Sequence, residues 1–263
     1  MSPSSRGNQR GFTLTELAMV IFIIALIAGS GILSISGQRD AEQRRTTETA
    51  LATIREALVG FAMQNGRLPC PANATQASGS IGSGLEATTG TGSTLTCNCT
   101  GASPQCTTDS ATGVLPWVTL GLPETDPWGQ RYTYQVSRVY ARGIGNLNGY
   151  CSPEPTALPT QAAFALCTTG KTQVYQAITS LSPLVGTQLT NTDEVPAVVL
   201  SHGPNGFGGW QSTGNQAAAG STDEQINSDA DQIFISHPGM DDMVFWISSY
   251  VLKNRMITAG KLP

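Results

Sequence analysis

The sequence is poor in charge and has almost no histidine. Of its 263 residues, 12% are Asp, Glu, Lys or Arg, the net charge is −4, and the two histidines are His202 and His237. The chain therefore lacks the basic patch that is typical of nucleic-acid-binding proteins, and nucleic acid is not favoured as a partner. No G-x-S-x-G, H-E-x-x-H, Walker or G-x-G-x-x-G pattern occurs, which removes the commonest enzyme signatures.

The two histidines each follow a serine, in Ser201-His202 and Ser236-His237. A serine nucleophile needs a histidine base, a third group that orients the base, and an oxyanion site. The sequence has no pattern for the last two. We therefore predict that the protein is not an enzyme and that both pairs are turn residues at strand ends.

Long apolar runs are also absent, with one exception near the amino terminus. Between Phe12 and Ser36 the only charged residue is Glu16. About 25 helical residues are about 37 Å long, enough for a hydrocarbon core of about 30 Å. Arg6 and Arg10 precede the run and favour a cytoplasmic amino terminus. We predict a membrane-spanning helix half at 12–36, because a cleaved secretory signal would have a shorter apolar core.

The helical pattern continues beyond the apolar run. From Asp40 to Asn65 there is no proline, and Leu51, Ile54 and Leu58 recur at helical spacing, followed by Phe61. Asn65-Gly66 is a helix stop signal. We therefore predict an amphipathic half at 37–65, so that one helix of about 50 residues leads to a globular domain at 66–263.

The stretch Gly11-Phe12-Thr13-Leu14-Thr15-Glu16 resembles the class III signal of type IV prepilins and type II secretion pseudopilins. The resemblance implies that prepilin peptidase removes the leader, residues 1–11, by cutting between Gly11 and Phe12. It also implies N-methylation of Phe12, and it makes Glu16 the fifth residue of the mature chain. The fold it implies is pilin-like and α+β: a long helix packed on an antiparallel sheet, here with a disulfide-bearing loop insertion.

Placing Glu16 in lipid is unfavourable, because burying an unpaired carboxylate in hydrocarbon costs several kcal/mol of free energy. The resemblance implies a partner for it, the methylated amine of a neighbouring subunit's Phe12 in a helical filament. In an isolated subunit, Glu16 is expected at the headgroup interface of the membrane lipid. The resemblance also implies two kinds of partner, other pilin or pseudopilin subunits and an inner-membrane assembly platform. It implies that the chain first lies in the bacterial inner membrane, with the globular domain in the periplasm, and is then incorporated into the filament.

Six cysteines follow the apolar run: Cys70, Cys97, Cys99, Cys106, Cys151 and Cys167. An even number outside the cytosol favours disulfides, whose pairing the sequence leaves open. The alternative is a zinc site around Cys97, Cys99 and Cys106, but their spacing is not that of a zinc knuckle and no histidine is near.

The globular part is expected to be α+β with an antiparallel sheet. Alternating apolar residues predict four strands and a carboxyl-terminal helix that ends near Gly260. The predicted strands are Arg131–Val136, Ala197–Ser201, Gln232–Ser236 and Met243–Ile247. The segment at about 72–113 has almost no large apolar residues, so we expect a surface insertion that supplies no core and is held by disulfides.

Two loops resemble those of type II secretion major pseudopilins. Asp126-Pro127-Trp128-Gly129 is a turn signature, although Arg131 stands where that family often has proline. The stretch Leu200–Gly209 resembles a loop that holds calcium in those proteins, which implies Asn205, Asp229 and Asp231 as possible Ca²⁺ ligands. Asn205 replaces the family's usual aspartate, and ordinary turn formation is the competing explanation. Asp241-Asp242 is expected to be a turn or cap pair.

Together these features predict a pilin-like structural subunit, minor or specialised, of a type IV pilus or a type II secretion pseudopilus. The alternative is a single-pass, membrane-anchored periplasmic domain with a binding or enzymatic function. The mass of the mature chain separates the two, because only the first predicts loss of residues 1–11 and one added methyl group.

Overall fold

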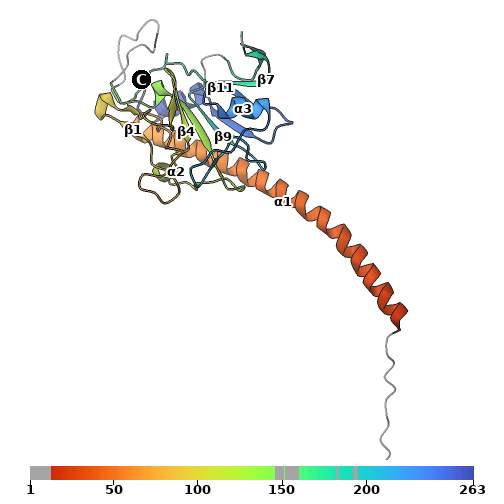
Figure 1. The fold of residues 1–263 in the computed structure, drawn as a ribbon. Coiled ribbons are helices and arrows are strands. Elements are labelled where there is room, and N and C mark those ends of the chain that lie inside the picture. The colour runs from red at the N-terminus through yellow and green to blue at the C-terminus, as the bar shows by residue number, and fades with distance from the viewer. Residues whose placement is uncertain (1–12, 146–150, 152–159, 182–183, 192–194) are drawn as a thin grey trace, which may run out of the picture. The chain divides into compact units, whose positions relative to one another are not determined.

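The structure is a computed structural model that describes residues 13–145, 151, 160–181, 184–191 and 195–263, without the side chains of 28–37. The chain divides into two units, residues 1–44 and 45–263. Each is described by itself below, and Figure 1 shows the elements in chain order.

Helix α1 covers Leu14–Asn65, so the predicted helix of about 50 residues is confirmed. Its end is built as the stop signal requires. The side-chain amide of Asn65 donates to the backbone carbonyl of Phe61, and Gly66 follows with φ +71°. A Cβ on Gly66 would lie 2.1 Å from the carbonyl oxygen of Gln161, so only glycine fits here.

The first part of α1 presents large apolar side chains to solvent. Exposed fractions range from 85% at Leu14 to 49% at Val20, and Phe22 and Ile27 lie between them. Within the described residues, no helix is both long and apolar enough to count as a membrane span. Residues 28–36 of the predicted span at 12–36 have side chains that are not described, and the span stays a prediction.

In the unit 45–263 the main sheet has five antiparallel strands in the order β12-β9-β6-β4-β3. The strands are β3 (Gln105–Cys106), β4 (Ser110–Val114), β6 (Thr133–Ser137), β9 (Ala197–Ser201) and β12 (Met243–Ile247). Leu51, Ile54 and Leu58 of α1 share one buried core with Tyr134 and Val199 of this sheet, among others. This part of α1 therefore buries one side against the sheet, whereas Ala52, Arg55 and Glu56 are exposed.

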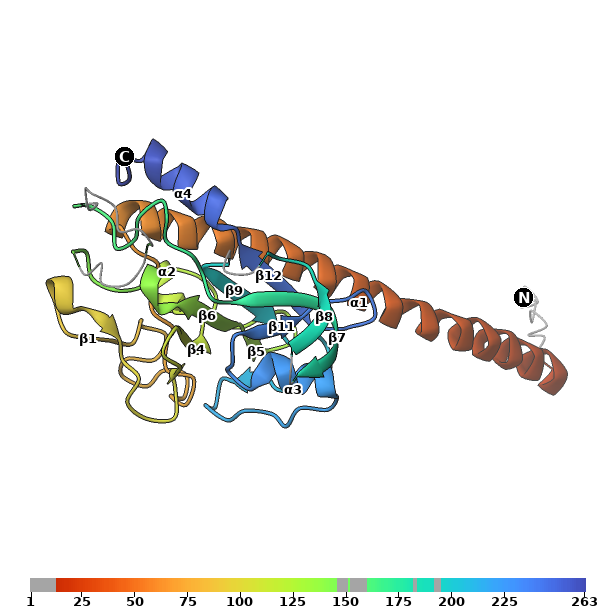
Figure 2. The same ribbon diagram turned by 90° about the horizontal axis from the view of Figure 1, so that it is seen from above.

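Helix α4 (Ser249–Thr258) completes that core. Its buried Leu252 and Met256 belong to the same cluster, and Figure 2 shows α4 lying along the carboxyl-terminal part of α1. Gly260 follows with φ +69°, as the predicted stop requires.

The sequence predicted β9 and β12 residue for residue. The expected strand Arg131–Val136 is instead split at Tyr132 into β5 (Gln130–Arg131) and β6. β5 leaves the main sheet and pairs with β10 (Trp210–Gln211). The alternation of residue types continues through Tyr132, so sequence gave no sign of this change of partner.

The expected strand Gln232–Ser236 forms as β11 (Ile233–Ile235), but outside the main sheet. It lies parallel to β7 (Gln173–Leu181), which pairs with β8 (Leu184–Gln188) in a second, three-stranded sheet. The prediction of an antiparallel sheet was therefore wrong for this strand. Strand propensity does not specify the partner, which here is fixed by tertiary packing.

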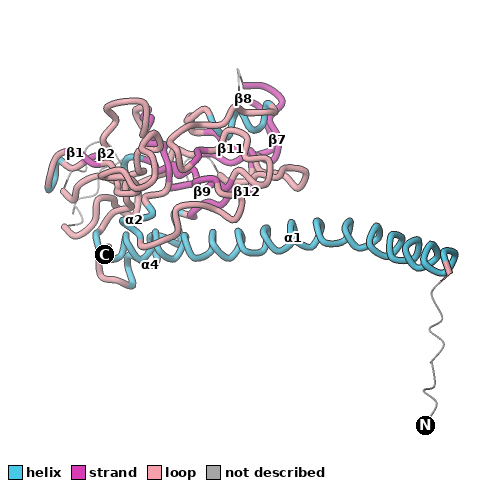
Figure 3. Tube along the Cα trace, turned by 60° about the horizontal axis from the view of Figure 1, so that its bottom comes forward, coloured by secondary structure: helices cyan, strands magenta, loops and turns pink. Residues whose placement is uncertain are grey.

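The expectation that 72–113 supplies no core was also wrong. β4 is buried along its length and sits inside the main sheet, and Ala72, Ala74 and Cys97 are buried as well. Small residues suffice at β4 because neighbouring backbone approaches closely: a Cβ on Gly113 would lie 2.5 Å from the Ala72 carbonyl oxygen. The rest of the insertion is mostly loop, as Figure 3 shows around β1 and β2.

Short elements complete the described fold. They are β1 (Thr88–Thr89), β2 (Thr96–Cys97), α2 (Trp117–Leu120), α3 (Thr222–Ser228) and two 3₁₀ turns at Gly92–Thr94 and Arg138–Tyr140. All six cysteines form disulfides, as predicted. The pairs are Cys70–Cys97, Cys99–Cys106 and Cys151–Cys167.

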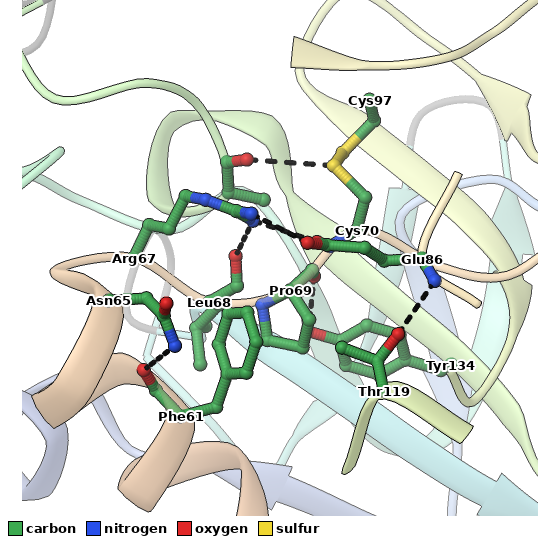
Figure 4. A network of polar contacts seen from close by, with 11 residues as sticks. Phe61, Asn65, Arg67, Leu68, Pro69, Cys70, Glu86, Cys97, Thr119 and Tyr134 are labelled. Carbon is green, nitrogen blue, oxygen red and sulfur yellow. Dashed lines mark hydrogen bonds and ion pairs between the residues drawn. A yellow bond between two sulfur atoms is a disulfide. The ribbon is translucent and has the colours of Figure 1, made fainter. Parts of the chain in front are cut away.

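A polar network ties the insertion to the end of α1 (Figure 4). Arg67 donates to both carboxylate oxygens of Glu86, at 2.8 and 2.7 Å, and its guanidinium lies over the ring of Phe61. The Cys70 amide donates to the same carboxylate. Because Glu86 lies inside the insertion and Cys70 carries a disulfide, this network and the Cys70–Cys97 bond hold the same part of the loop.

Candidate processing and assembly site

Glu16 closes the first turn of α1. The Thr13 amide and hydroxyl both donate to Glu16 Oε2, at 2.9 and 2.8 Å, and the Glu16 amide donates back to the Thr13 hydroxyl at 3.3 Å. This is a capping box, with Thr13 as N-cap and Glu16 three positions later. The carboxylate thus satisfies the N–H group of the N-cap residue Thr13 and lies at the positive end of the helix dipole.

The predicted cleavage and methylation residues, Gly11 and Phe12, lie outside the described residues. Their neighbour Thr13 is fully described, so the structure places the helix start two residues after the predicted cut. The signal for the capping box, Thr-x-x-Glu, is visible in the sequence. It was missed because the family resemblance gave Glu16 another role.

The predicted turn at Asp126 forms as expected. Asp126 Oδ1 accepts from the amides of Trp128 and Gln130, and Gly129 has φ +86°. Asp126 Oδ2 accepts from the hydroxyl of Ser201 at 2.6 Å. Burial raises the pKa of this carboxyl, and the hydrogen bonds from Ser201 and the turn oppose that shift.

The serine–histidine pairs do not form catalytic dyads. The Ser201 hydroxyl donates to Asp126, whereas His202 Nε2 lies 2.8 Å from the hydroxyl of Thr133. His237 Nε2 contacts Asp223 at 3.1 Å. These contacts give the residues structural partners, in agreement with their interpretation as strand-end turns.

The three predicted calcium ligands are each engaged by protein groups. The Asn205 amide nitrogen donates to Glu224 of α3 at 2.7 Å, and its oxygen accepts from the Phe207 amide. Asp229 and Asp231 accept from backbone amides within their own turn. Throughout the described part of the chain, no group of three or more His, Cys, Asp or Glu could hold a metal ion. Calcium binding by Asn205, Asp229 and Asp231 therefore stays an untested prediction.

We expect the thermal unfolding of the full chain in detergent to be the same in CaCl₂ and in EDTA, because the described residues contain no group of three or more His, Cys, Asp or Glu that could hold a metal ion. Differential scanning fluorimetry measures this directly. A midpoint that rises with Ca²⁺, and no longer rises in Asp231→Asn, would establish the site after all.

Two buried groups in this region have pKa values shifted in opposite directions. Burial lowers the pKa of His202 to about 4. Burial raises the pKa of Asp242 to about 7, helped by the charges of Asp241 and Glu224 and opposed by a hydrogen bond from Asn227. Asp242, expected as part of a turn or cap pair, is a buried residue whose carboxylate accepts a hydrogen bond from the side chain of Asn227.

These shifts predict opposite pH slopes of stability. His202 has a folded pKa below its unfolded value of about 6.5, so its contribution is lost as pH falls from 6.5 to 4. Asp242 has a folded pKa above its unfolded value of about 3.9, so its contribution is lost as pH rises from 4 to 7. His202→Gln removes a contribution that grows with pH, so the stability of this variant relative to wild type should fall as pH rises. Asp242→Asn removes a contribution that is lost with rising pH, so the stability of this variant relative to wild type should rise as pH rises.

Urea unfolding at pH 4.5, 5.5 and 6.5 measures both slopes, and every other titrating group cancels in the comparison with wild type. Identical slopes in the two variants would contradict the assignment of these shifts to His202 and Asp242.

Comparison with known proteins places the amino-terminal segment. Residues 6–32 match the family model of the prokaryotic N-terminal methylation motif. The amino-terminal segment is that of the prepilin and pseudopilin family. The chain is also 31% identical over 72 residues to type II secretion system core protein G of Klebsiella michiganensis. These 72 residues are 27% of this chain and 51% of that protein. The chain thus spans about half the length of that relative. No solved structure matches this chain.

The prepilin segment contains the whole of the capping box, and the recognition made from Gly11 to Glu16 is confirmed. The match ends at residue 32, before the core-forming part of α1 begins. The globular unit, which lies beyond the matched residues, is an α+β fold with an antiparallel main sheet and disulfides.

Proposed function

We propose that the protein is a pilin-like structural subunit, minor or specialised, of a type II secretion pseudopilus or a type IV pilus. The observation that carries the proposal is the prepilin methylation motif at residues 6–32. The motif contains the start of helix α1, whose later part, from Leu51 on, belongs to the core of a folded domain. In this proposal the globular unit has a pilin-like fold.

Processing follows from the motif. Prepilin peptidase cuts between Gly11 and Phe12, and Phe12 becomes the N-methylated first residue. The chain is held in the inner membrane by residues 12–36 before assembly, with its globular unit in the periplasm. The large exposed side chains from Leu14 to Ile27 support this, because so much unpaired apolar surface needs lipid or neighbouring helices to cover it.

Assembly uses Glu16 a second time. In a subunit by itself, its carboxylate caps α1 through Thr13. In the filament, the carboxylate pairs with the methylated amine of a neighbouring Phe12, which neutralises both charges away from water. A carboxylate has about four lone-pair positions, so the capping bonds do not exclude the new partner. An inner-membrane platform and other subunits are the remaining partners.

Glu16→Ala separates processing from assembly. We expect the cleaved, methylated chain to accumulate in membranes, while its amount in the sheared or purified filament fraction falls at least about tenfold, since an unpaired amine is left in an apolar filament core. Mass spectrometry and immunoblotting measure the two steps.

Thr13→Ala is the matched control. It removes the capping hydroxyl at a cost of about 1 kcal/mol of helix stability but keeps the carboxylate. We expect it to assemble nearly as wild type does. Normal incorporation of Glu16→Ala, or an equal defect in Thr13→Ala, would contradict the pairing role.

A further inference from the structure

Strand β12 is an edge of the main sheet with an unusual composition for an edge. It pairs with β9 on one side, and within the described residues its other side makes no backbone hydrogen bond. Its sequence, Met-Val-Phe-Trp-Ile, has no charge and no proline. Proteins usually protect edge strands with charged residues or proline, because a free edge is a template for another strand.

A groove of about 330 Å³ runs along this edge, and we call it the β12 groove. Met243, Val244 and Phe245 all line it. Consecutive strand residues point to opposite faces, so a groove that touches all three follows the edge of the strand and not one face. Its other wall is a stripe of α1 that includes Ala52 and Arg55.

Asp242 lines the same groove at the beginning of β12. Its side chain is buried, with 6% exposed. Oδ2 accepts from the amide of Asn227 at 2.8 Å, but Oδ1 is buried without a hydrogen-bond partner among the described residues. A buried carboxylate oxygen without a donor is costly, so this position favours a ligand that brings a positive charge or an N–H group.

We propose that the β12 groove binds an extended strand of another polypeptide that carries an Arg or Lys side chain beside Asp242. The strand adds to the free edge of β12 through backbone hydrogen bonds, a known mode of peptide recognition. Its basic side chain supplies the donor that Asp242 Oδ1 lacks. The site lies within the globular unit and does not depend on the proposed filament function.

None of the described strands of a second copy would provide that strand. Among the described strands, only β5 has a basic residue, Arg131, and this side chain is fully buried. The edge strands of the second sheet are β8, which reads Leu-Val-Gly-Thr-Gln, and β11, which reads Ile-Phe-Ile, and neither offers a cation. The charge requirement therefore points to a polypeptide of different sequence.

The test is peptide binding to the full chain in detergent, followed by fluorescence anisotropy. The probe is a labelled peptide, Ser-Thr-Val-Arg-Val-Thr-Ser. We expect saturable binding that weakens about tenfold when Gln replaces Arg in the peptide, since hydrogen bonds to charged groups are worth about 1.5–3 kcal/mol. A peptide with methylated backbone nitrogens should not bind, because strand addition needs those donors.

Variants of the protein complete the test. Asp242→Asn should bind the Arg and Gln peptides equally. Ala52→Trp, at an exposed position of α1, should block the groove and abolish binding, whereas Glu56→Trp, exposed one turn on and outside the groove, should bind as wild type does. Unchanged thermal melts confirm that each variant is folded.

Three results would overturn the proposal. They are the absence of saturable binding, equal binding of the Arg, Gln and N-methylated peptides, and binding that persists in Ala52→Trp. Self-association of the full chain that the peptide displaces and Ala52→Trp abolishes would assign the edge to a second copy instead, and would also overturn it.

Discussion

Replacing Arg131 by Met should destabilise the globular unit by about 3–5 kcal/mol. Arg131 is fully buried, and its guanidinium donates twice to Glu124 and to three backbone carbonyls, those of Ala74, Gln76 and Ser212. Methionine fills much of the space but provides no donor. Glu124 and the carbonyls would lose these donors, and the carbonyl of the buried Ala74 would be left without Arg131 where an unpaired group costs most.

The three carbonyls explain the size of the effect. Ala74 and Gln76 belong to the insertion and Ser212 to the loop after β10, so one side chain joins β5 to two segments that are distant from it in sequence. The ring of Trp117 packs against the same guanidinium at 4.8 Å. The departure from the pseudopilin pattern at this position thus coincides with the insertion that Arg131 holds.

Urea unfolding of the full chain in detergent, followed by tryptophan fluorescence, measures the change. Arg55→Met is the matched control, because Arg55 is exposed and pairs with the exposed Glu56, and such pairs contribute about 0–1 kcal/mol. A loss below about 1 kcal/mol in Arg131→Met would contradict the account of this network.

Removing the Cys70–Cys97 disulfide, as Cys70→Ala with Cys97→Ala, should cost about 3.5 kcal/mol. The two cysteines are 27 residues apart, and the chain-entropy model gives about this value for a loop of that length. Both side chains are also buried, so truncation adds a packing loss. The insertion should open first, because Glu86 and Cys70 lie in one network.

The Cys99–Cys106 pair is the control for this variant. Its ends are 7 residues apart, so the same model gives about 2.3 kcal/mol. Denaturant unfolding and limited proteolysis of the insertion compare the two. Equal stability losses, or a larger loss for the shorter loop, would contradict the assignment of Cys70–Cys97 as the main constraint on this segment.

The sequence predicted the elements that have a strong local pattern. α1 carries apolar residues at helical spacing and a glycine stop, and β9 and β12 are short runs of apolar or β-branched residues. β4 was missed because Ser-Ala-Thr-Gly-Val has little apolar character. Its place in the sheet depends on neighbours that are distant in sequence, and propensity does not contain that information.

The site residues divide in the same way. The match at residues 6–32 confirms the family recognised from Gly11 to Glu16, because that signal is local. The burial of Asp242 and the convergence of loops on Arg131 were beyond reach, since both depend on tertiary packing. The capping role of Glu16 was within reach, because Thr13 and Glu16 have the spacing of a capping box.

The mass of the mature chain tests the central claim most directly. The protein, purified from cells with an active prepilin peptidase, should lack residues 1–11 and begin with a Phe12 that carries one methyl group. Tandem mass spectrometry of the amino-terminal peptide would locate that methyl group. An intact amino terminus, or a cut after the apolar run near residue 30, would contradict the proposal of a pilin-like subunit.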